Sequence, residues 1–236
     1  MFTKPELESW LADISVHVHK STSIYLIGGC ALSFKDIKAR TKDIDIITIS
    51  KKDFDALNHA MLKSGFKLDT DLDNEFYLTA LAVYKKEDSR IDVFLNKVGQ
   101  MLTFTSSMKK RSTLYKDYGE LKVFLVSNED IFLFKAMTPR EGDIYDCESI
   151  MRLGPDYGII YREALEQSKE GNKWFFWVFE KICAIENYTG KMIPIKSKIY
   201  ALVKEYWGQK PDDFMQDIEN LEQHIADKRL LKELRK

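Results

Sequence analysis

The sequence has almost no net charge and no long apolar run. Its 36 lysine and arginine residues nearly balance its 37 aspartate and glutamate residues, which leaves a formal charge of −1. Without an excess of positive charge there is no global field to attract nucleic acid, so any such contact would need a local basic patch. No window approaches about 18 uninterrupted apolar residues, which excludes a membrane-spanning helix of ordinary length.

Cysteine is scarce and forms no recognisable motif. The three cysteines, Cys30, Cys147 and Cys183, contain no CxxC spacing, and their odd number argues against a disulfide framework. We expect them to be small buried hydrophobic residues in a reducing compartment. The first residues include acids and no long apolar stretch, so we expect no signal peptide. These absences predict a soluble cytoplasmic protein with no membrane partner.

Residues 1–126 combine helical and strand patterns. Helices are predicted where apolar residues recur at helical spacing, and strands where β-branched residues dominate between turn signals. Gly65 closes one helical pattern as a C-cap signal. The expected order is a helix over 4–19, a strand over 23–29, a short helix over 30–37, a strand over 43–50, a helix over 51–66, an antiparallel hairpin from 75–86 and 89–98, and two further strand pieces around a basic, polar loop within 100–126.

From Ser127 onward nearly every segment has helical period. Ser127 or Asn128 is expected to cap the first of these helices, which has acids in its first turn. We therefore predict an α+β fold, with a small mixed or antiparallel sheet and flanking helices over residues 1–126 and an all-helical domain over residues 127–236. The segment 173–186 is apolar all round its helix and is expected to form the core of the helical domain.

Two acids stand where a buried strand is expected to begin. Asp43 and Asp45 are separated by one residue, so on a strand their side chains point to the same face. Two carboxylates this close repel each other unless a cation lies between them, and hard divalent cations such as Mg²⁺ favour sites made only of oxygen. Asp92 is a third acid within an expected strand. If that strand lies beside the first, three carboxylates converge in an arrangement that suits metal-assisted phosphoryl or nucleotidyl transfer.

The residues before this strand fit a bound phosphate. Gly28 and Gly29 end the preceding strand, and glycine there permits close approach of the backbone to a phosphate group. The following loop is basic, since four of its eight residues from 35 to 42 are the cations Lys35, Lys38, Arg40 and Lys42. These side chains are suited to a triphosphate or to a nucleic-acid backbone.

The order of these motifs resembles that of a known superfamily. GGCAL, then ARTKDIDI, then RIDVF resemble the DNA polymerase β-type nucleotidyltransferases, which share a glycine turn and helix, a D-x-D strand and a later strand acid. EDIFLFKAMTPREGDIYDCESIM is similar to the lysine motif and the R-x-x-D-x-x-D motif of AbiEii-type nucleotidyltransferases, which include toxins of toxin–antitoxin pairs. The chain departs from the pattern at Cys30, where many relatives have serine or another small residue, and in DIKAR, which lacks the glycine usual there.

The resemblance implies a polymerase β-like core and a role for each matching residue. It implies that Asp43 and Asp45 bind metal, that Lys135 lies near the triphosphate, and that Asp92 corresponds to the third carboxylate of the superfamily. The candidate residues are therefore Asp43, Asp45, Asp92, Lys135 and Asp146 as catalytic, Gly28, Gly29, Arg40, Lys42 and Asp143 as nucleotide-binding, and Asp43, Asp45 and Asp92 as metal ligands.

The function that the resemblance implies is nucleotidyl transfer. We expect Mg²⁺ or Mn²⁺ as cofactor, a nucleoside triphosphate (NTP) as co-substrate, and a macromolecular acceptor such as a tRNA 3′ end, in a toxin-like enzyme with a cognate antitoxin. Other acceptors in the same enzyme class are a protein side chain and a small molecule. The alternative outside the enzyme class is a degenerate fold that binds a nucleotide or a partner as a regulatory module.

Several of these residues also have a purely structural reading. Lys135 would then be a helix lysine whose charged end reaches solvent, Asp143 a helix cap, and Arg140 a partner of Glu141 or Asp143. Lys109, Lys110 and Arg111 would contact an RNA backbone or form a solvated basic loop. The segment 173–186 would be a docking surface for an antitoxin if it is not core.

Overall fold

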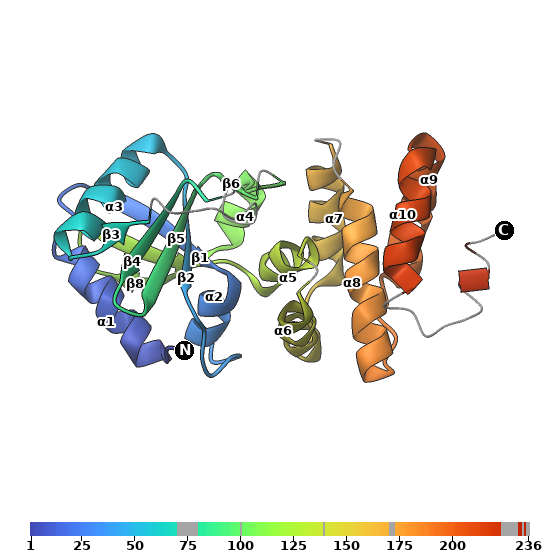
Figure 1. Cartoon of the computed structure of the whole chain (residues 1–236), viewed down its shortest axis with the longest axis horizontal. Coiled ribbons are helices and arrows are strands. Elements are labelled where there is room, and N and C mark those ends of the chain that lie inside the picture. The colour runs from blue at the N-terminus through green and yellow to red at the C-terminus, as the bar shows by residue number, and fades with distance from the viewer. Residues whose placement is uncertain are drawn as a thin grey trace. The chain divides into compact units, whose positions relative to one another are not determined.

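The computed structural model of the chain describes residues 1–69, 80–99, 101–138, 140–169, 173–222, 231–232 and 234. The chain divides into two compact units, Met1–Phe134 and Lys135–Lys236. The first unit contains the strands, and the second is helical (Figure 1). The expected α+β fold, a mixed sheet with flanking helices followed by a helical half, is confirmed.

A seven-stranded sheet of order β3-β4-β5-β2-β1-β9-β8 forms the first unit. β2 pairs in parallel with β5 and β1 in parallel with β9, whereas the other neighbours are antiparallel. A separate two-stranded sheet joins β6 to β7. The strands are β1 Thr22–Ile27, β2 Ile44–Thr48, β3 Lys67–Leu68, β4 Ala82–Lys86, β5 Ser89–Leu95, β6 Lys97–Val98, β7 Leu102–Thr103, β8 Thr113–Asp117 and β9 Leu121–Leu125.

Helices flank this sheet and make up the second unit. α3 packs against β1 and β2 and against α1, while α2 packs against the same two strands and α1. The helices of the first unit are α1 Lys4–Ser15, α2 Gly28–Phe34, α3 Lys51–Lys63 and α4 Ser106–Arg111; those that follow are α5 Asn128–Ala136, which contains the boundary between the units, α6 Glu141–Arg152, α7 Tyr157–Ser168, α8 Trp174–Thr189, α9 Lys196–Gln209 and α10 Pro211–Glu222.

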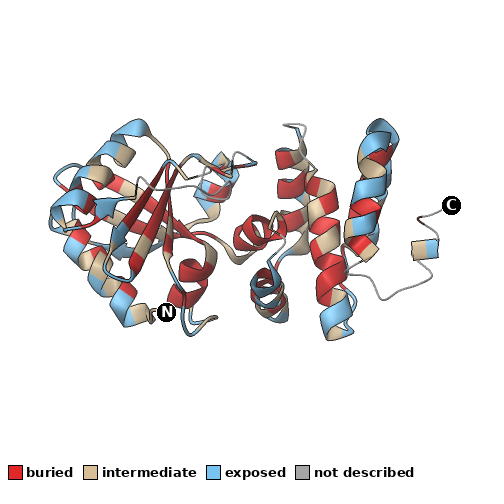
Figure 2. Cartoon of the chain, in the orientation of Figure 1, coloured by how far each residue is buried: buried red, intermediate tan, exposed pale blue. Residues whose placement is uncertain are grey.

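The central strands are apolar because both faces of the sheet are covered there. Ile24 and Leu26 of β1 and Ile44, Ile46 and Ile47 of β2 have no exposed surface. Figure 2 shows buried residues concentrated on these strands and on α5 and α8. Strands buried on two faces read as continuous apolar runs, so a polar residue within them, such as Asp45 or Asp92, is a departure that needs a reason.

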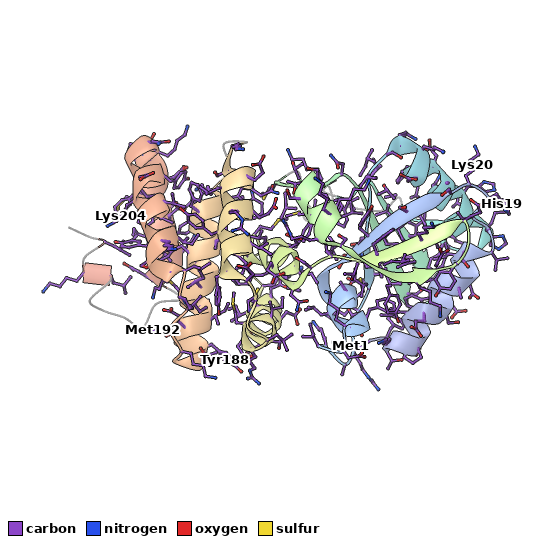
Figure 3. The ribbon with its side chains drawn as sticks, turned by 180° about the vertical axis from the view of Figure 1, so that it is seen from behind. Met1, His19, Lys20, Tyr188, Met192 and Lys204 are labelled. Atoms are coloured by element: carbon purple, nitrogen blue, oxygen red, sulfur yellow. The ribbon has the colours of Figure 1, made fainter. Side chains whose placement is uncertain are left out.

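Local signals begin and end α3 where the sequence indicates, whereas α1 ends earlier than expected. The Ser50 side chain accepts a hydrogen bond from the Asp53 N–H at 3.1 Å and begins α3, and Gly65, at φ +84°, follows its end. Phe2 bridges to Thr41 in the loop between α2 and β2, and Figure 3 labels Met1 near this region. α1 ends at Ser15 rather than at His19.

The hairpin is confirmed where the structure describes it, and the prediction for 100–126 is right in placing strands there and wrong in placing a loop at the basic segment. β4 and β5 are antiparallel neighbours, while residues 75–79 of the expected strand lie outside the described residues. Lys109, Lys110 and Arg111 form the last turn of α4, not a loop between strands. The Thr105 hydroxyl begins this helix by accepting from the Met108 N–H at 3.1 Å. A helix of six residues is too short to show a repeating pattern of apolar and polar residues, so the hydrophobic periodicity of the sequence did not predict α4.

The second unit has an apolar core along α8. Trp174, Phe179 and Ile182 of this helix are fully buried, so the segment 173–186 is core, as expected, and not an exposed docking surface. Beyond this segment, Tyr188 and Met192 are 57% and 91% exposed and project outward in Figure 3. All three cysteines are buried, and none of them forms a disulfide. Within the described parts of the chain, no helix is long and apolar enough to cross a membrane.

A buried ion pair joins α4 to the start of α5. Asp130 is fully buried and accepts from Arg111 Nη2 at 2.6 Å and Nε at 3.2 Å. Ser127 is the cap of α5, since its Oγ accepts from the Asp130 N–H at 3.2 Å and its hydroxyl donates to the Asp130 carboxylate at 2.9 Å. Each oxygen of this buried carboxylate therefore has a donor, which is what makes burial of its charge tolerable.

We expect Asp130→Ala to lower the free energy of unfolding by about 3–5 kcal/mol, because Arg111 loses its buried partner. Urea denaturation measures this loss. The double variant Arg111→Met/Asp130→Leu removes both charges and should be clearly more stable than Asp130→Ala. A double variant as unstable as the single one would show that packing, rather than the unpaired charge, determines the cost.

Candidate functional site

Three carboxylates meet where β2 lies beside β5. The parallel register places Asp45 directly opposite Asp92, and Asp43 precedes Asp45 by two residues, so all three share one face. One oxygen from each of Asp43, Asp45 and Asp92 lies within 4.8 Å of the other two. Asp92 is buried, and the other two are half-buried. Their neighbours Ile44 and Ile46 point into the core and have no exposed surface.

This oxygen cluster fits a hard divalent cation. Mg²⁺ and Mn²⁺ prefer carboxylate ligands and retain positions for water and phosphate oxygens, which three aspartates leave available. Nitrogen or sulfur ligands, which zinc favours, are not part of the cluster among the described residues. The residues present therefore suit a magnesium-type site.

The glycine turn makes room for the cluster. Gly28 has φ +63°, and a Cβ added to it would lie 2.2 Å from Oδ2 of Asp45. A Cβ on Gly29 would lie 2.6 Å from the hydroxyl oxygen of Thr41, which is buried. The two glycines are thus required by side chains of the protein itself, since Asp45 and Thr41 occupy the space that any larger residue would need.

Cys30 of α2 contacts the backbone of β2 at Asp45. Its thiol donates to the Ile27 carbonyl at 3.0 Å, and its sulfur accepts from the Asp45 N–H at 3.4 Å. Burial, together with the negative charge of Asp45, raises the pKa of this thiol well above its ordinary value. Cys30 is therefore a neutral packing residue that contacts the backbone of a cluster residue.

The basic loop offers its cations unequally. Lys38 reaches the glycine turn, with Nζ 3.7 Å from the position a Cβ would take on Gly29. Arg40 and Lys42 are exposed. Burial lowers the pKa of Lys35, although the charges of Glu129 and Asp130 act against this shift. Lys38 is thus the loop cation whose charged end lies against the glycine turn.

The missing glycine of this loop has a structural substitute. Asp36 adopts φ +60°, in the left-handed region that favours glycine. Aspartate tolerates this region better than most residues, and its carboxylate pairs with Lys4 at 2.9 Å. The loop can therefore make its turn without glycine.

Lys135, Asp143 and Asp146 form a buried charged cluster in the second unit. Lys135 Nζ lies 2.6 Å from Oδ1 of Asp143 and 2.7 Å from Oδ2 of Asp146. All three side chains are buried. Asp143 also accepts from Arg140 Nε at 3.1 Å and from the Thr138 hydroxyl.

This geometry decides between the structural readings of these residues. Lys135 does not extend to solvent, because it is only 6% exposed and its charged end lies between two carboxylates. Asp143 is not the cap of α6, since Arg140 occupies the N-cap position. Arg140 pairs with Asp143, one of the two partners considered.

The cluster shifts the pKa values of its members in opposite directions. Burial acts against the charge of Lys135, but the carboxylates of Asp143 and Asp146 outweigh it and raise its pKa to about 12. Burial alone would raise the pKa of Asp143, but the charge and hydrogen bond of Lys135 hold it below the ordinary 3.8. Each group thus stabilises the charged form of the other.

Arg90 belongs to the carboxylate cluster and was not among the predicted site residues. Arg90 Nε and Nη2 donate to the two oxygens of Asp92 at 2.6 and 2.8 Å. The signal was present, because residues two apart on a strand share a face, and a cation two positions before a strand acid is placed to pair with it. Thr41, quoted only as a neighbour of Arg40, proves to be the residue that Gly29 accommodates.

Comparison with known families bears on this arrangement. The sequence model of one family, described as nucleotidyltransferase of unknown function (DUF6036), matches residues 6–154, more than half of the chain. The matched segment includes the three aspartates, the glycine turn and the Lys135 cluster. No match was found among curated proteins. The match supports a nucleotidyltransferase family and does not extend to the AbiEii-like branch.

We expect Gly28→Ala to weaken Mn²⁺ binding and lower stability, because the new Cβ would displace the Asp45 carboxylate. Gly119→Ala is a matched control, since Gly119 has φ +83° but no atom within 4 Å of its Cβ position. Both variants should lose about 1–2 kcal/mol from left-handed backbone strain, and Gly28→Ala more. Titration with Mn²⁺ should show weaker binding only for Gly28→Ala; equal binding in both variants would contradict the assigned role of Gly28.

We expect Lys135→Met to lower the free energy of unfolding at pH 7 by about 3–5 kcal/mol, because two buried carboxylates lose their cation. The stability that Asp143 contributes is present above pH 3.8 and is lost as the pH falls through its lowered pKa. The contribution of Lys135 is present below pH 10.5 and is lost as the pH rises through about 12. The gap between wild type and variant should therefore narrow in acid and in strong base.

Denaturation across pH measures this gap. Lys169→Met is the control, since Lys169 and its partner Glu166 have side chains 69% and 53% exposed, and an exposed pair contributes about 0–1 kcal/mol. A gap for Lys135→Met that stays constant between pH 7 and pH 3 would contradict the ion-pair explanation.

Proposed function

This chain belongs to the family of nucleotidyltransferases of unknown function (DUF6036), and we propose that it is a metal-dependent enzyme that moves a nucleoside monophosphate from an NTP to a macromolecular acceptor. The convergence of Asp43, Asp45 and Asp92 within 4.8 Å is the observation that supports this proposal most directly. These residues would hold Mg²⁺ or Mn²⁺, and the bound cation would stabilise negative charge on the transferring phosphoryl group and make an attacking hydroxyl easier to deprotonate.

The bonds exchanged are at the α-phosphorus of the NTP. An acceptor hydroxyl forms a bond to this phosphorus, the bond to the β-phosphate oxygen breaks, and pyrophosphate leaves with the electron pair. Asp92 would serve as ligand or as acceptor of the hydroxyl proton. Lys38, Arg40 and Lys42 would supply positive charge to the triphosphate from the loop beside the glycine turn.

The Lys135 cluster has a supporting role in this proposal. Because Lys135 Nζ already contacts Asp143 and Asp146, we assign to the cluster the task of holding α5 and α6 together. Direct contact of Lys135 with the leaving pyrophosphate, with Asp143 near the nucleotide, is the second reading. In this second reading the Lys135 ammonium group would have to give up its contact with one carboxylate in order to contact a phosphate group.

The choice of acceptor in this proposal is based on the resemblance to the AbiEii-like branch. That resemblance favours an RNA such as a tRNA 3′ end, a toxin-like role in the cytoplasm and a cognate antitoxin as partner. Lys109 and Lys110 are exposed on α4 and are available to an RNA backbone, whereas Arg111 is engaged by Asp130. A protein or small-molecule acceptor, and a degenerate nucleotide-binding module, remain the alternative proposals.

Incubation with each α-³²P-labelled NTP, Mg²⁺ and total tRNA tests the proposal, with products resolved on a denaturing gel. We expect wild-type protein to label RNA and Asp43→Asn/Asp45→Asn to lose at least about 100-fold in rate, because stabilisation of charge at the transferring phosphoryl group is lost. Asp55→Asn removes an acid from an exposed pair with Lys51 on α3 and should retain full activity.

The product separates the alternatives. Label on polypeptide instead of RNA would identify a protein acceptor. Absence of transfer with every NTP and acceptor, in protein that binds NTP, would refute the enzyme and leave the binding module.

A further inference from the structure

Arg90 is a cation held directly on the carboxylate cluster. Its Nε and Nη2 donate to the separate oxygens of Asp92 at 2.6 and 2.8 Å. The two side chains are only 20% and 12% exposed. Two parallel charge-assisted bonds from a planar guanidinium to one carboxylate are the strongest form of this interaction in proteins. Asp92 therefore enters the cluster with part of its charge already neutralised.

The strand geometry directs Arg90 toward the cluster. Arg90 precedes Asp92 by two residues on β5, so both side chains project from the same face. Across the sheet, Arg90 is opposite Lys85 of β4, and Asp92 is opposite Asp45 of β2. Like charges directly opposite each other are unfavourable. Lys85 pairs with Asp69 at 2.6 Å. Arg90 pairs with Asp92 of its own strand, on the side of β5 where β2 contributes Asp45.

A divalent cation and this guanidinium need the same ligand. Both require the oxygens of Asp92, and two positive groups on one carboxylate repel each other in a half-buried site where screening by water is weak. Binding of a cation that uses Asp92 therefore has to loosen or displace the Arg90 pair. That displacement has a cost, and the cost reduces the affinity for the metal.

We propose that Arg90 competes with the divalent cation for Asp92 and so sets the metal affinity of the cluster. The inference rests on the metal site of the proposed function and not on the transfer reaction. Arg90 is in this sense a built-in counter-ion that keeps the three acids compatible with a folded sheet. Its guanidinium lowers the repulsion among the three carboxylates and is displaced from Asp92 when a divalent cation binds.

Mn²⁺ titration of the full chain without nucleotide, followed by the electron paramagnetic resonance signal of free Mn²⁺, tests this competition. Removing a competing charged hydrogen-bond pair should tighten Mn²⁺ binding in Arg90→Gln by about tenfold or more. Arg90→Lys should lie between wild type and Arg90→Gln, because lysine is a point charge without the two-pronged fit. Asp92→Asn should bind Mn²⁺ more weakly than wild type.

Arg111→Gln is the matched control. It removes the same charge from another two-bond arginine–aspartate pair of the same unit, at Asp130. A general effect of net charge on Mn²⁺ affinity would appear in both arginine variants. An effect confined to Arg90→Gln would come from competition at Asp92. Arg111→Gln should lower stability without changing Mn²⁺ affinity.

Unchanged or weaker Mn²⁺ binding by Arg90→Gln would overturn the proposal and show that Arg90 merely orients Asp92. Failure of both wild type and Arg90→Gln to bind Mn²⁺ would overturn it as well. If Arg90→Gln does not fold, the Mn²⁺ affinity of Arg90→Lys is the test. Tighter binding than wild type supports the proposal, and unchanged or weaker binding overturns it. Tighter binding by Arg90→Gln in a protein that transfers no nucleotide would retain this inference while refuting the proposed function.

Discussion

The parallel pairing of β2 with β5 is the contact on which the carboxylate cluster depends. It places Asp45 opposite Asp92 and, through the two-residue period of a strand, brings Asp43 to the same face. A shift of one residue in this register would turn Asp92 toward the opposite face and leave an apolar side chain in its place. The buried residues Ile44, Ile46 and Val93 oppose such a shift, because they would have to leave the core. The core therefore maintains the geometry of the polar site.

Such a cluster is costly, and its surroundings reduce the cost. The Arg90 guanidinium balances Asp92 within the strand, and the absence of a side chain at Gly28 lets the Asp45 carboxylate lie against the backbone. Cys30 contributes a weak acceptor to the Asp45 N–H without adding charge. Arg90, Gly28 and Cys30 each occupy their position because of an aspartate that they contact. Their own strand or helix propensities do not account for these positions.

The second unit uses burial of charge for a different purpose. Lys135, Asp143 and Asp146 satisfy one another so fully that the pKa of the lysine rises and that of Asp143 falls. Lys135 lies 2.6 Å from Asp143 and 2.7 Å from Asp146, so removal of the lysine would leave two buried carboxylates without their cation. The residues that match a catalytic motif in the sequence form buried ion pairs in the structure, and their part in catalysis stays a prediction.

The sequence by itself determined most of the elements and the identity of the three acids. Apolar runs, the cap at Ser127 and Gly65 are local signals, so the sheet-bearing half, the helical half and the β4–β5 hairpin were predictable from them. Local signals failed at Lys109–Arg111, where a single helical turn is stabilised by a distant partner, Asp130. Only the tertiary structure decided that β5 lies beside β2, that Arg90 neutralises Asp92, and that Lys135 is enclosed by two carboxylates. Strand order and ion pairing depend on contacts between residues far apart in the chain, and a periodic pattern carries no information about which strand or charge a given residue will meet.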